Sequence, residues 1–332
     1  NRTTQFDGDG VPEETILWAA DKAVTLTNPK LRMISNWQKR LSPSIANAIR
    51  FMQGLVHTFP AVRPLSPKCW AGDPALRAFF VTPRDIDGLL ARSDQLRAVF
   101  EKYPALDEAY LVLGMAITEQ KVFGMAIRGD TVQRDVAQNV VSFSDHKTRL
   151  CGPDEAALRR VIGIEIFEYL ISRALAEIGA ERAERQELQA SRALIRTRLR
   201  LLQQHGPGLG AMLGDEPAAA GEQARLEAEL LENERQLAEM GASEEQLTGE
   251  LETLQAVLDR PEDYLAFSPL RLRLNTMNVM VGETEAGTDI DFAIVDLKGQ
   301  LPVRRAFVIA RVARSDMPPA QTLNFYEAMR YL

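Results

Sequence analysis

Three neighbouring residues, Ser144, Asp145 and His146, have the types that a hydrolase uses as nucleophile, acid and base. They lie in a segment whose composition predicts a β-strand, in which successive side chains point to opposite faces. A catalytic triad needs its three groups within hydrogen-bond reach of one another. Because adjacent strand residues cannot meet in this way, we expect no catalytic site here and no enzymatic activity from the chain.

The cysteines and histidines are too few and too scattered to hold a metal. The chain has two cysteines, Cys69 and Cys151, and three histidines, His57, His146 and His205. A zinc site needs ligands in closely spaced pairs, so we expect no metal and no cofactor. We expect two free thiols, which are typical of a reducing compartment, and therefore a cytoplasmic protein.

The main candidates for an anion site are arginines on the strands predicted after residue 261, namely Arg271, Arg273, Arg304, Arg305 and Arg311. If these side chains converge on one face, they could bind a nucleotide or an acidic peptide. The alternative is the solvated outer face of a sheet. The sequence lacks the combination of Arg-x-x-x-Arg with a downstream Asp/Asn-x-Ser-x-x-Gly that would indicate a cyclic dinucleotide. Their arrangement in space therefore decides between the two interpretations.

A glycine-rich stretch, HGPGLGAMLGDEPAAAGE, occupies residues 205–222. A phosphate-binding loop needs a preceding strand and a Lys-Ser or Lys-Thr pair, and neither is present. We interpret this stretch as the tip of a helical hairpin, at about residues 204–221. Met212 and Leu213 at the tip are candidate contacts for a partner protein.

Two long helical arms flank this tip and together cover residues 154–261. Both arms are rich in helix-forming residues, and apolar residues recur in each at the 3.5-residue period of a coiled coil. Folding the chain at about residue 212 aligns the two seams and pairs Leu199 with Leu226, Ile195 with Leu230, Leu188 with Leu237, Ile178 with Leu247, Arg185 with Met240, Arg192 with Asn233 and Glu181 with Glu244. The sequence therefore predicts an antiparallel coiled-coil hairpin.

The charges of the arms favour the same pairing. Residues 191–205 contain four arginines and no acid, whereas the returning arm is strongly acidic. Arms of opposite sign favour each other over a second copy of themselves. On the outer face of the acidic arm, Glu227 and Glu234 are candidates to attract a basic partner, and the alternative is an ordinary solvated surface.

The segments before the arms divide into a tail, a helical region and strands. Residues 1–12 are polar and predict a loose tail. Residues 13–103 predict a helical domain, with helices at 13–26, at 30–41, from Ser42-Pro43 onward and at 84–103. Residues 104–153 predict a β-hairpin with its turn at 118–121, followed by a strand over 139–150.

Two short patterns in the strand regions carry further information. The pattern Leu-Gly-Met-Ala-Ile at residues 113–117 recurs, with Phe for Leu, at residues 123–127. Glycines at matched places inside strands predict close approach by a neighbouring group. After the arms, Leu and Arg alternate from residue 270, a second hairpin turns at residues 298–300, and a short helix ends the chain over 320–332.

The sequence therefore predicts an α+β protein that is predominantly helical. An N-terminal helical domain precedes a small mixed or antiparallel β domain, residues 104–153 plus 262–332, and the coiled-coil hairpin is inserted between the strands. Two short sheets separated by a rod of roughly 50 Å would each lack a core. Because a hairpin returns to its origin, its flanking strands can share one sheet.

Bulk composition narrows the class of partner. The 332 residues carry a formal net charge of −7, and 45% of them are hydrophobic. A phosphate backbone is bound by clustered Lys and Arg, so we do not expect nucleic acid as a partner. We find no stretch apolar enough to span a membrane and no signal peptide. The chain begins with Asn, so we expect upstream residues in which a signal or anchor could lie.

These observations favour a non-enzymatic scaffold or adaptor that presents a rigid arm to a protein partner or to a second copy of itself. A helical hairpin inserted in a β domain also resembles the layout of the membrane fusion proteins of export pumps. That resemblance implies a periplasmic adaptor, although no paired lipoyl-like half-motifs flank the arms. A second alternative is an anion or nucleotide sensor that uses the arginines of the β domain.

Overall fold

The computed structural model describes residues 10–128, 131–205, 216–240, 243–299 and 302–319. It is a mixed α+β structure that divides into two compact units. The helical unit consists of Asn1–Ile49 and Glu168–Arg260, and the sheet unit consists of Arg50–Phe167 and Pro261–Leu332. This division separates the first helices from the rest of the helical domain that we expected over 13–103.

Four expected features fall wholly or partly on residues outside this description. They are the tail at 1–12, the hairpin tip with Met212 and Leu213, the turn at 298–300 and the final helix at 320–332.

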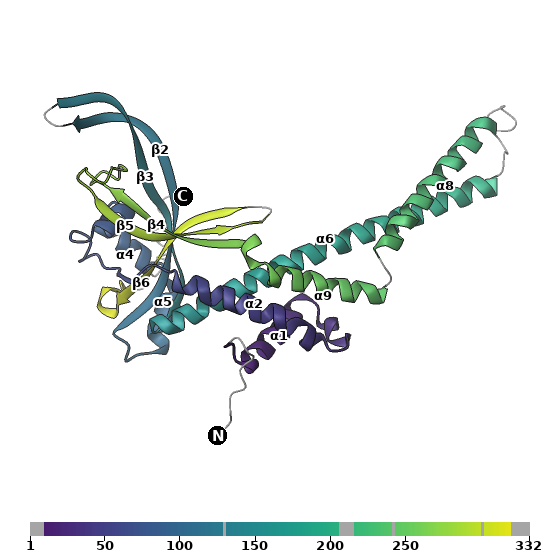
Figure 1. The fold of residues 1–332 in the computed structure, drawn as a ribbon, viewed down its shortest axis with the longest axis horizontal. Coiled ribbons are helices and arrows are strands. Elements are labelled where there is room, and N and C mark those ends of the chain that lie inside the picture. Colours follow the sequence, from purple (N-terminus) through teal and green to yellow (C-terminus); the bar gives the residue numbers. More distant parts are fainter. Residues whose placement is uncertain (1–9, 129–130, 206–215, 241–242, 300–301, 320–332) are drawn as a thin grey trace, which may run out of the picture. The chain divides into compact units, whose positions relative to one another are not determined.

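The sheet unit is built on one six-stranded sheet with the order β3-β2-β6-β5-β4, in which all five of these strands are antiparallel to their neighbours (Figure 1). A short strand, β1 (Arg63–Pro64), adds to β6 in parallel. The main strands are β2 (Glu108–Arg128), β3 (Thr131–Gly152), β4 (Leu265–Leu274), β5 (Thr288–Leu297) and β6 (Val303–Ala313). Strands from before and after the long helices therefore share one sheet.

The segment between β4 and β5 joins the two outer strands of this sheet. Val279 forms a bridge with Val140 of β3, and Met280 forms a bridge with Leu274 of β4. The Asn275 side chain shapes this segment, because its Oδ1 accepts hydrogen bonds from the backbone N–H of Met277 and Val279. The sheet is thus curved, and part of its exposed edge is covered.

Three short helices pack into the concave face of the sheet: α3 (Pro74–Phe79), α4 (Pro83–Ala91) and α5 (Asp94–Lys102). Phe79 of α3 lies edge-on to Phe143 of β3 and Phe292 of β5, with ring centroids 4.9 and 6.4 Å apart. A fully buried aromatic or aliphatic side chain of this kind stabilises a fold by about 1.5–3 kcal/mol. This core supplies the main apolar burial of the sheet unit.

The opposite face of the sheet is covered by residues just after the end of α2 (Trp37–His57) and at the start of α6 (Glu155–His205). Phe59 packs on Phe267 of β4 and Phe307 of β6, with both centroid distances 5.4 Å. Arg159 lies over the Phe59 ring and donates a hydrogen bond to the carbonyl of Val56 at 2.5 Å. Arg159 belongs to the first turns of α6 and Val56 to the end of α2.

The expected hairpin turn at residues 118–121 is wrong, because β2 continues straight through it to Arg128. Within this stretch, Thr118 pairs with Ser142, and Gln120 pairs with Val140. The polar run that we interpreted as a turn is an exposed part of a long two-stranded ribbon formed by β2 and β3. Polar residues fit a strand when neither of its faces is buried.

β-Bulges bend this ribbon at three places, next to Leu111, Gly114 and Gly124, and each inserts an extra residue into β3. Two of the inserted regions contain residues with positive φ, Asp145 at 46° and Leu150 at 51°. A Cβ on Gly124 would lie 2.4 Å from Oε1 of Gln138. The close approach predicted at this glycine is therefore confirmed, and it comes from a side chain of the partner strand.

The first helix of the helical unit, α1 (Glu13–Thr27), confirms the expectation for residues 13–26. The second expected helix, at 30–41, is wrong. A short 3₁₀ helix, η1 (Pro29–Met33), comes first, and Asn36 with φ of 58° separates it from α2. A left-handed residue cannot continue a helix, so α2 begins only at Trp37.

The expected helix start at Ser42-Pro43 is also wrong, since Pro43 lies inside α2. Ser42 donates to the carbonyl of Gln38 at 2.8 Å and does not cap a new helix. Leu41 and Ile45 are fully buried on either side of the proline. Burial of this continuous apolar face offsets the one backbone hydrogen bond that Pro43 cannot donate.

The expected helix over 84–103 is two helices in the structure, α4 and α5, with the break at Arg92 and Ser93. Ser93 is buried and accepts a hydrogen bond from Thr148 of β3 at 2.8 Å. The break turns the chain so that Leu90 and Leu96 both enter the core under the sheet.

The long helices α6, α8 (Glu216–Glu239) and α9 (Ser243–Asp259) contact one another in the helical unit. Ile195 and Leu199 of α6 form an apolar cluster with Leu226 and Leu230 of α8. Further along, Arg185 donates to the carbonyl of Met240. The returning segment is divided between two helices, with residues 241–242 outside the description.

The N-terminal segment packs against the base of these helices. Gln255 of α9 donates to the carbonyl of Arg40 at 2.8 Å, and Asn47 of α2 donates to the carbonyl of Leu258 at 3.2 Å. α9 therefore has two neighbours within the helical unit, α6 and the N-terminal helices. Among the helices that the structure describes, none is long and apolar enough to cross a membrane.

Two glycines of the sheet unit test the close contact between the end of β3 and the first turn of α6. A Cβ on Gly152 would lie 2.9 Å from the backbone nitrogen of Leu158, whereas a Cβ on Gly163 in α6 would meet nothing within 4 Å. We expect Gly152→Ala to destabilise the protein by about 1–3 kcal/mol, since backbone cannot yield. We expect Gly163→Ala to stabilise it by about 0.5–1 kcal/mol. Urea unfolding followed by circular dichroism measures both, and equal effects would contradict the described contact.

Candidate functional site

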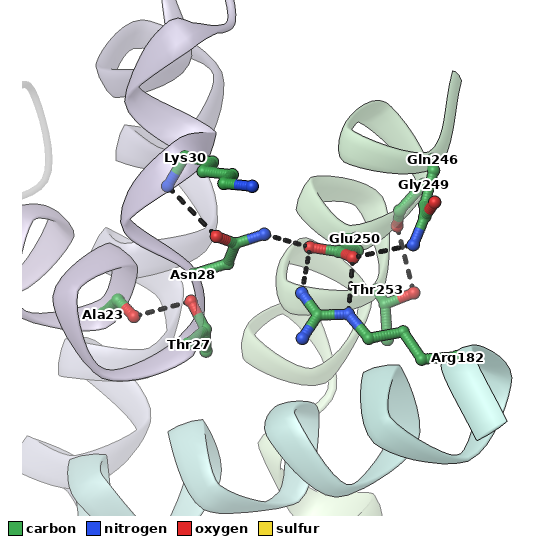
Figure 2. A network of polar contacts seen from close by, with 9 residues as sticks. All are labelled: Ala23, Thr27, Asn28, Lys30, Arg182, Gln246, Gly249, Glu250 and Thr253. Carbon is green, nitrogen blue, oxygen red and sulfur yellow. Dashed lines mark hydrogen bonds and ion pairs between the residues drawn. The ribbon is translucent and has the colours of Figure 1, made fainter. Parts of the chain in front are cut away.

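The most deeply buried charge among the described residues belongs to Glu250 of α9, whose side chain is 4% exposed. Arg182 of α6 donates to both carboxylate oxygens, through Nε at 2.8 Å and Nη2 at 2.7 Å. Asn28 donates to the same carboxylate through Nδ2 at 2.6 Å. Figure 2 shows these groups converging on Glu250 from α6 and from the junction of α1 and η1.

Local structure holds Asn28 in place for this contact. Asn28 ends α1 and begins η1, and its Oδ1 accepts a hydrogen bond from the backbone N–H of Lys30 at 3.0 Å. The oxygen is therefore used by the cap, and Nδ2 is left to donate to the carboxylate (Figure 2). An asparagine suits this position because it can cap a helix and donate at the same time.

The electrostatic balance keeps Glu250 ionised. Burial alone raises the pKa of this carboxyl, but hydrogen bonds from Arg182 and Asn28 outweigh burial and lower the pKa below its usual value. The same contact raises the pKa of Arg182, because its hydrogen bond to Glu250 favours the charged guanidinium. A buried charge held by a bidentate partner and a third donor is geometrically demanding. We call Glu250, Arg182 and Asn28 the Glu250 lock.

The chemistry open to the Glu250 lock is limited. A hollow of about 550 Å³ lies beside it and is lined in part by Lys30, Met33 and Leu247. The carboxylate is already paired and has a lowered pKa, so it is a poor proton acceptor. Thr253, the nearby hydroxyl, donates to the carbonyl of Gly249 at 3.0 Å and is not directed at Glu250 (Figure 2). The lock is suited to holding helices together.

The arginines proposed as an anion site are each paired with an acid. Arg271 Nε lies 2.6 Å from Asp291, and Arg273 Nη1 lies 3.2 Å from Asp289. Both pairs join β4 to β5 at directly opposed positions of the ladder. They are cross-strand ion pairs on the sheet surface, which stabilise a sheet modestly.

The other three arginines of that set are also paired, and they do not share one face. Arg305 lies 2.8 Å from Asp145, Arg311 lies 3.0 Å from Glu108, and Arg304 lies 3.7 Å from Asp296. Arg304 and Arg305 are successive residues of β6, so their side chains leave the strand on opposite faces. The structure therefore does not bring these arginines together into one open cationic site.

The acidic candidates on the arm differ in their partners. Glu234 lies 2.5 Å from Arg196 and joins α8 to α6. Glu227 accepts a hydrogen bond from Gln223 of its own helix at 2.8 Å. Leu231 lies between them on α8 and is 71% exposed. Residues at spacings of four and three share one helix face, so Glu227, Leu231 and Glu234 form a stripe in which Glu227 and Leu231 are exposed and Glu234 is half-buried. We call it the α8 stripe.

The hydrolase-like triplet has a structural explanation. His146 Nε2 lies 2.7 Å from the carbonyl of Phe79, and its ring stacks on Phe80 with centroids 4.5 Å apart. Burial lowers the pKa of His146, which favours the neutral ring. Asp145 is engaged by Arg305. The histidine therefore anchors α3 to β3 and is not paired with a nucleophile through these contacts.

The two cysteines are free, as expected, and both are partly buried. Burial raises the pKa of the Cys151 thiol to about 12. A thiol with such a pKa is almost entirely protonated near neutral pH and is a weak nucleophile. In the part of the chain that the structure describes, no group of three or more His, Cys, Asp or Glu residues could hold a metal ion.

Sequence reasoning did not single out the residues of the Glu250 lock. Glu250 lies one position before the expected seam residue Leu251, where an acid is typical of a solvated flank. A usable signal was the polar run Thr27-Asn28-Pro29, which predicts a helix end with a capping asparagine. Nothing in the sequence indicates that this cap meets α9.

Comparison with known proteins identifies no relative. No family model, no curated protein and no solved structure matches this chain.

Removing the charge of Glu250 tests the lock. Gln has the same shape, but its amide group would face the donors of Arg182 or Asn28 and would leave a guanidinium without its anion. We expect Glu250→Gln to destabilise the helical unit by about 1–3 kcal/mol, since Arg182 is partly exposed and regains some hydration. Glu232→Gln, which breaks an exposed ion pair with Arg235 in α8, is the matched control and is expected to cost less than about 1 kcal/mol. Equal losses in urea unfolding would contradict the lock.

The lock also predicts a pH dependence. The pKa of Glu250 is lower in the folded protein than its ordinary value of 4.5. Its contribution to the free energy of unfolding is therefore fully present above pH 4.5 and is lost as the pH falls through the lower folded pKa. We expect the stability difference between wild type and Glu250→Gln to be constant from pH 7 to pH 5 and to shrink toward pH 3. A difference that stays unchanged at pH 3 would refute this account.

Proposed function

We propose that this chain is a non-enzymatic interaction protein in which α6, α8 and α9 form an antiparallel coiled-coil arm that binds a protein partner. The α6 helix has 51 residues, which corresponds to roughly 76 Å at the rise of an α-helix. Most of the stability of a helix in a protein comes from the packing of its apolar face against other elements. The chain devotes a large part of its length to this arrangement.

The observation that carries the proposal is the set of contacts that recur between the helices. The apolar cluster of Ile195, Leu199, Leu226 and Leu230 joins α6 to α8. The ion pair between Arg196 and Glu234 lies beside it, and the Glu250 lock joins α6 to α9 at the base. Apolar layers flanked by ion pairs are the features that set register in coiled coils.

The α8 stripe is the surface that we assign to the partner. Leu231 is large, apolar and exposed, and it is flanked by two acids on the same face. An apolar anchor within a polar rim is the usual make-up of a binding patch. The acids would favour a partner with an apolar contact residue next to Lys or Arg.

Enzymatic and anion-sensing functions receive less support from the described residues. The buried or partly buried polar groups described above, at Glu250, His146 and Cys151, are held by structural contacts or have pKa values unsuited to catalysis at neutral pH. The arginines that an anion would need are paired with acids.

A pair of leucine variants on α8 tests the proposed function. We expect Leu231→Ser to leave unfolding within about 0.5 kcal/mol of wild type and to remove the partner in a pull-down from the native lysate. Leu226→Ala, at a buried position, is expected to cost about 2–3 kcal/mol. A third variant, with residues 192–233 replaced by a short glycine-containing turn, removes Glu227 and Leu231 of the stripe but leaves the lower layers. If the shortened and Leu231→Ser proteins retain every partner of wild type, the arm is not the binding element.

A further inference from the structure

The β2–β3 ribbon leaves the sheet with one of its edges open. β6 accompanies β2 only as far as the pair Met115–Ala306. β2 then continues to Arg128, paired on its other side with β3 (Figure 1). Among the described residues, none pairs with the outer edge of β2 from residue 116 onward. A two-stranded ribbon is marginally stable alone, and an open edge of this length is a template for another strand.

Both copies of the repeated five-residue pattern lie on β2, the first where its pairing with β6 ends and the second beyond that point. In its first copy, residues 113–117, Leu113 and Met115 are fully buried beside β6. The second copy, residues 123–127, has a bulge at the equivalent glycine. Its Phe123, which occupies the position of Leu113, is 78% exposed. β6 pairs with the first three residues of the first copy, whereas no strand among the described residues pairs with the outer edge of the second copy.

The open edge is complementary to itself. Its sequence from Ile117 to Phe123 reads Ile-Thr-Glu-Gln-Lys-Val-Phe. The alternate residues of this run share one face, because they pair in turn with Phe143, Val141, Asn139 and Ala137 of β3. If two such edges pair antiparallel about Gln120, Glu119 lies opposite Lys121 of the second copy, and Ile117 lies opposite its Phe123. Opposite charges and apolar side chains at directly opposed positions stabilise a strand pair.

We propose that the open edge of β2, residues 116–124, pairs with the same edge of a second copy of this chain. The two-fold axis passes through Gln120, and the two ribbons form a four-stranded antiparallel sheet. Such an interface is isologous, which is the commonest symmetry of soluble oligomers. The symmetry makes the Glu119–Lys121 pair twice and the Ile117–Phe123 pair twice. It uses the sheet unit alone and does not depend on the function proposed for the arm.

The size of the interface sets the expected strength of the dimer. A ladder of nine residues with one large apolar anchor per chain is below the surface that stable complexes bury. We therefore expect a reversible dimer with a dissociation constant on the order of micromolar. An unmatched lysine on an edge strand opposes pairing, and here Glu119 of the second copy neutralises that lysine.

Charge reversal on the full-length protein tests the register. In sedimentation velocity over a dilution series, we expect wild type to dimerise and Lys121→Glu to raise the dissociation constant at least tenfold, since Glu119 would face a second acid twice. We expect Glu119→Lys to raise the dissociation constant as well, because two lysines would then face each other. The double variant Glu119→Lys with Lys121→Glu restores complementarity and is expected to dimerise as wild type does. Both side chains are exposed, so circular dichroism should show unchanged folding.

Cysteine variants test the two-fold axis independently. Gln120→Cys would place two thiols opposite each other, at the separation of a strand pair, where a disulfide can form. Thr118→Cys would place them about 13 Å apart and is the matched control. We expect oxidation to cross-link only the Gln120→Cys protein beyond the level of wild type. A monomer at every concentration, or a dimer that Lys121→Glu forms as readily as wild type, would overturn the proposal.

Discussion

The helical unit depends on one electrostatic constraint, which is that the carboxylate of Glu250 must stay charged while its side chain is 4% exposed. An ion removed from water is tolerated only when its partners replace the lost hydration. Here Arg182 of α6 supplies two hydrogen bonds and Asn28 supplies a third. Apolar layers can slide past one another at small cost, but a bidentate ion pair cannot. The constraint therefore fixes the positions of α6, α9 and the first helix turn of η1 relative to one another.

The sheet unit is organised by a different requirement, the covering of strand edges. The bridges of Val279 to β3 and of Met280 to β4 link the outer strands through one short segment. His146 and Ser93 add contacts between β3 and the helices beneath it. The hydrogen bond of His146 to Phe79 and the pairing of Asp145 with Arg305 account for the positions of these two side chains. The edge of β2 beyond Met115 is left open among the described residues, and that edge supports the proposed dimer.

Local patterns predicted several elements well and failed where two patterns competed. The alternation of Leu and Arg from residue 270 predicted β4, and the helix predicted at residues 13–26 is α1 in the structure. The polar run at residues 118–121 and the Ser42-Pro43 pair carry signals of turns and helix starts. Each is overridden in the structure, by pairing with β3 in the first case and by the buried face of Leu41 and Ile45 in the second. Local propensities amount to fractions of a kcal/mol per residue, and tertiary burial exceeds them.

The sequence by itself determined the class of structure and the complementary patterns of the long helices, because apolar period and charge are properties of a chain read locally. It also contains the run around Gln120 whose charges are complementary to themselves, but only the strand pairing places that run on an open edge. Only the tertiary structure decided which residues form the Glu250 lock between α6, α9 and the start of η1. Asn28 and Glu250 are separated by 222 positions, and no local pattern reports a contact over that distance. The pairing of the five candidate arginines with acids was likewise decided by strand order and register, which depend on the whole sheet.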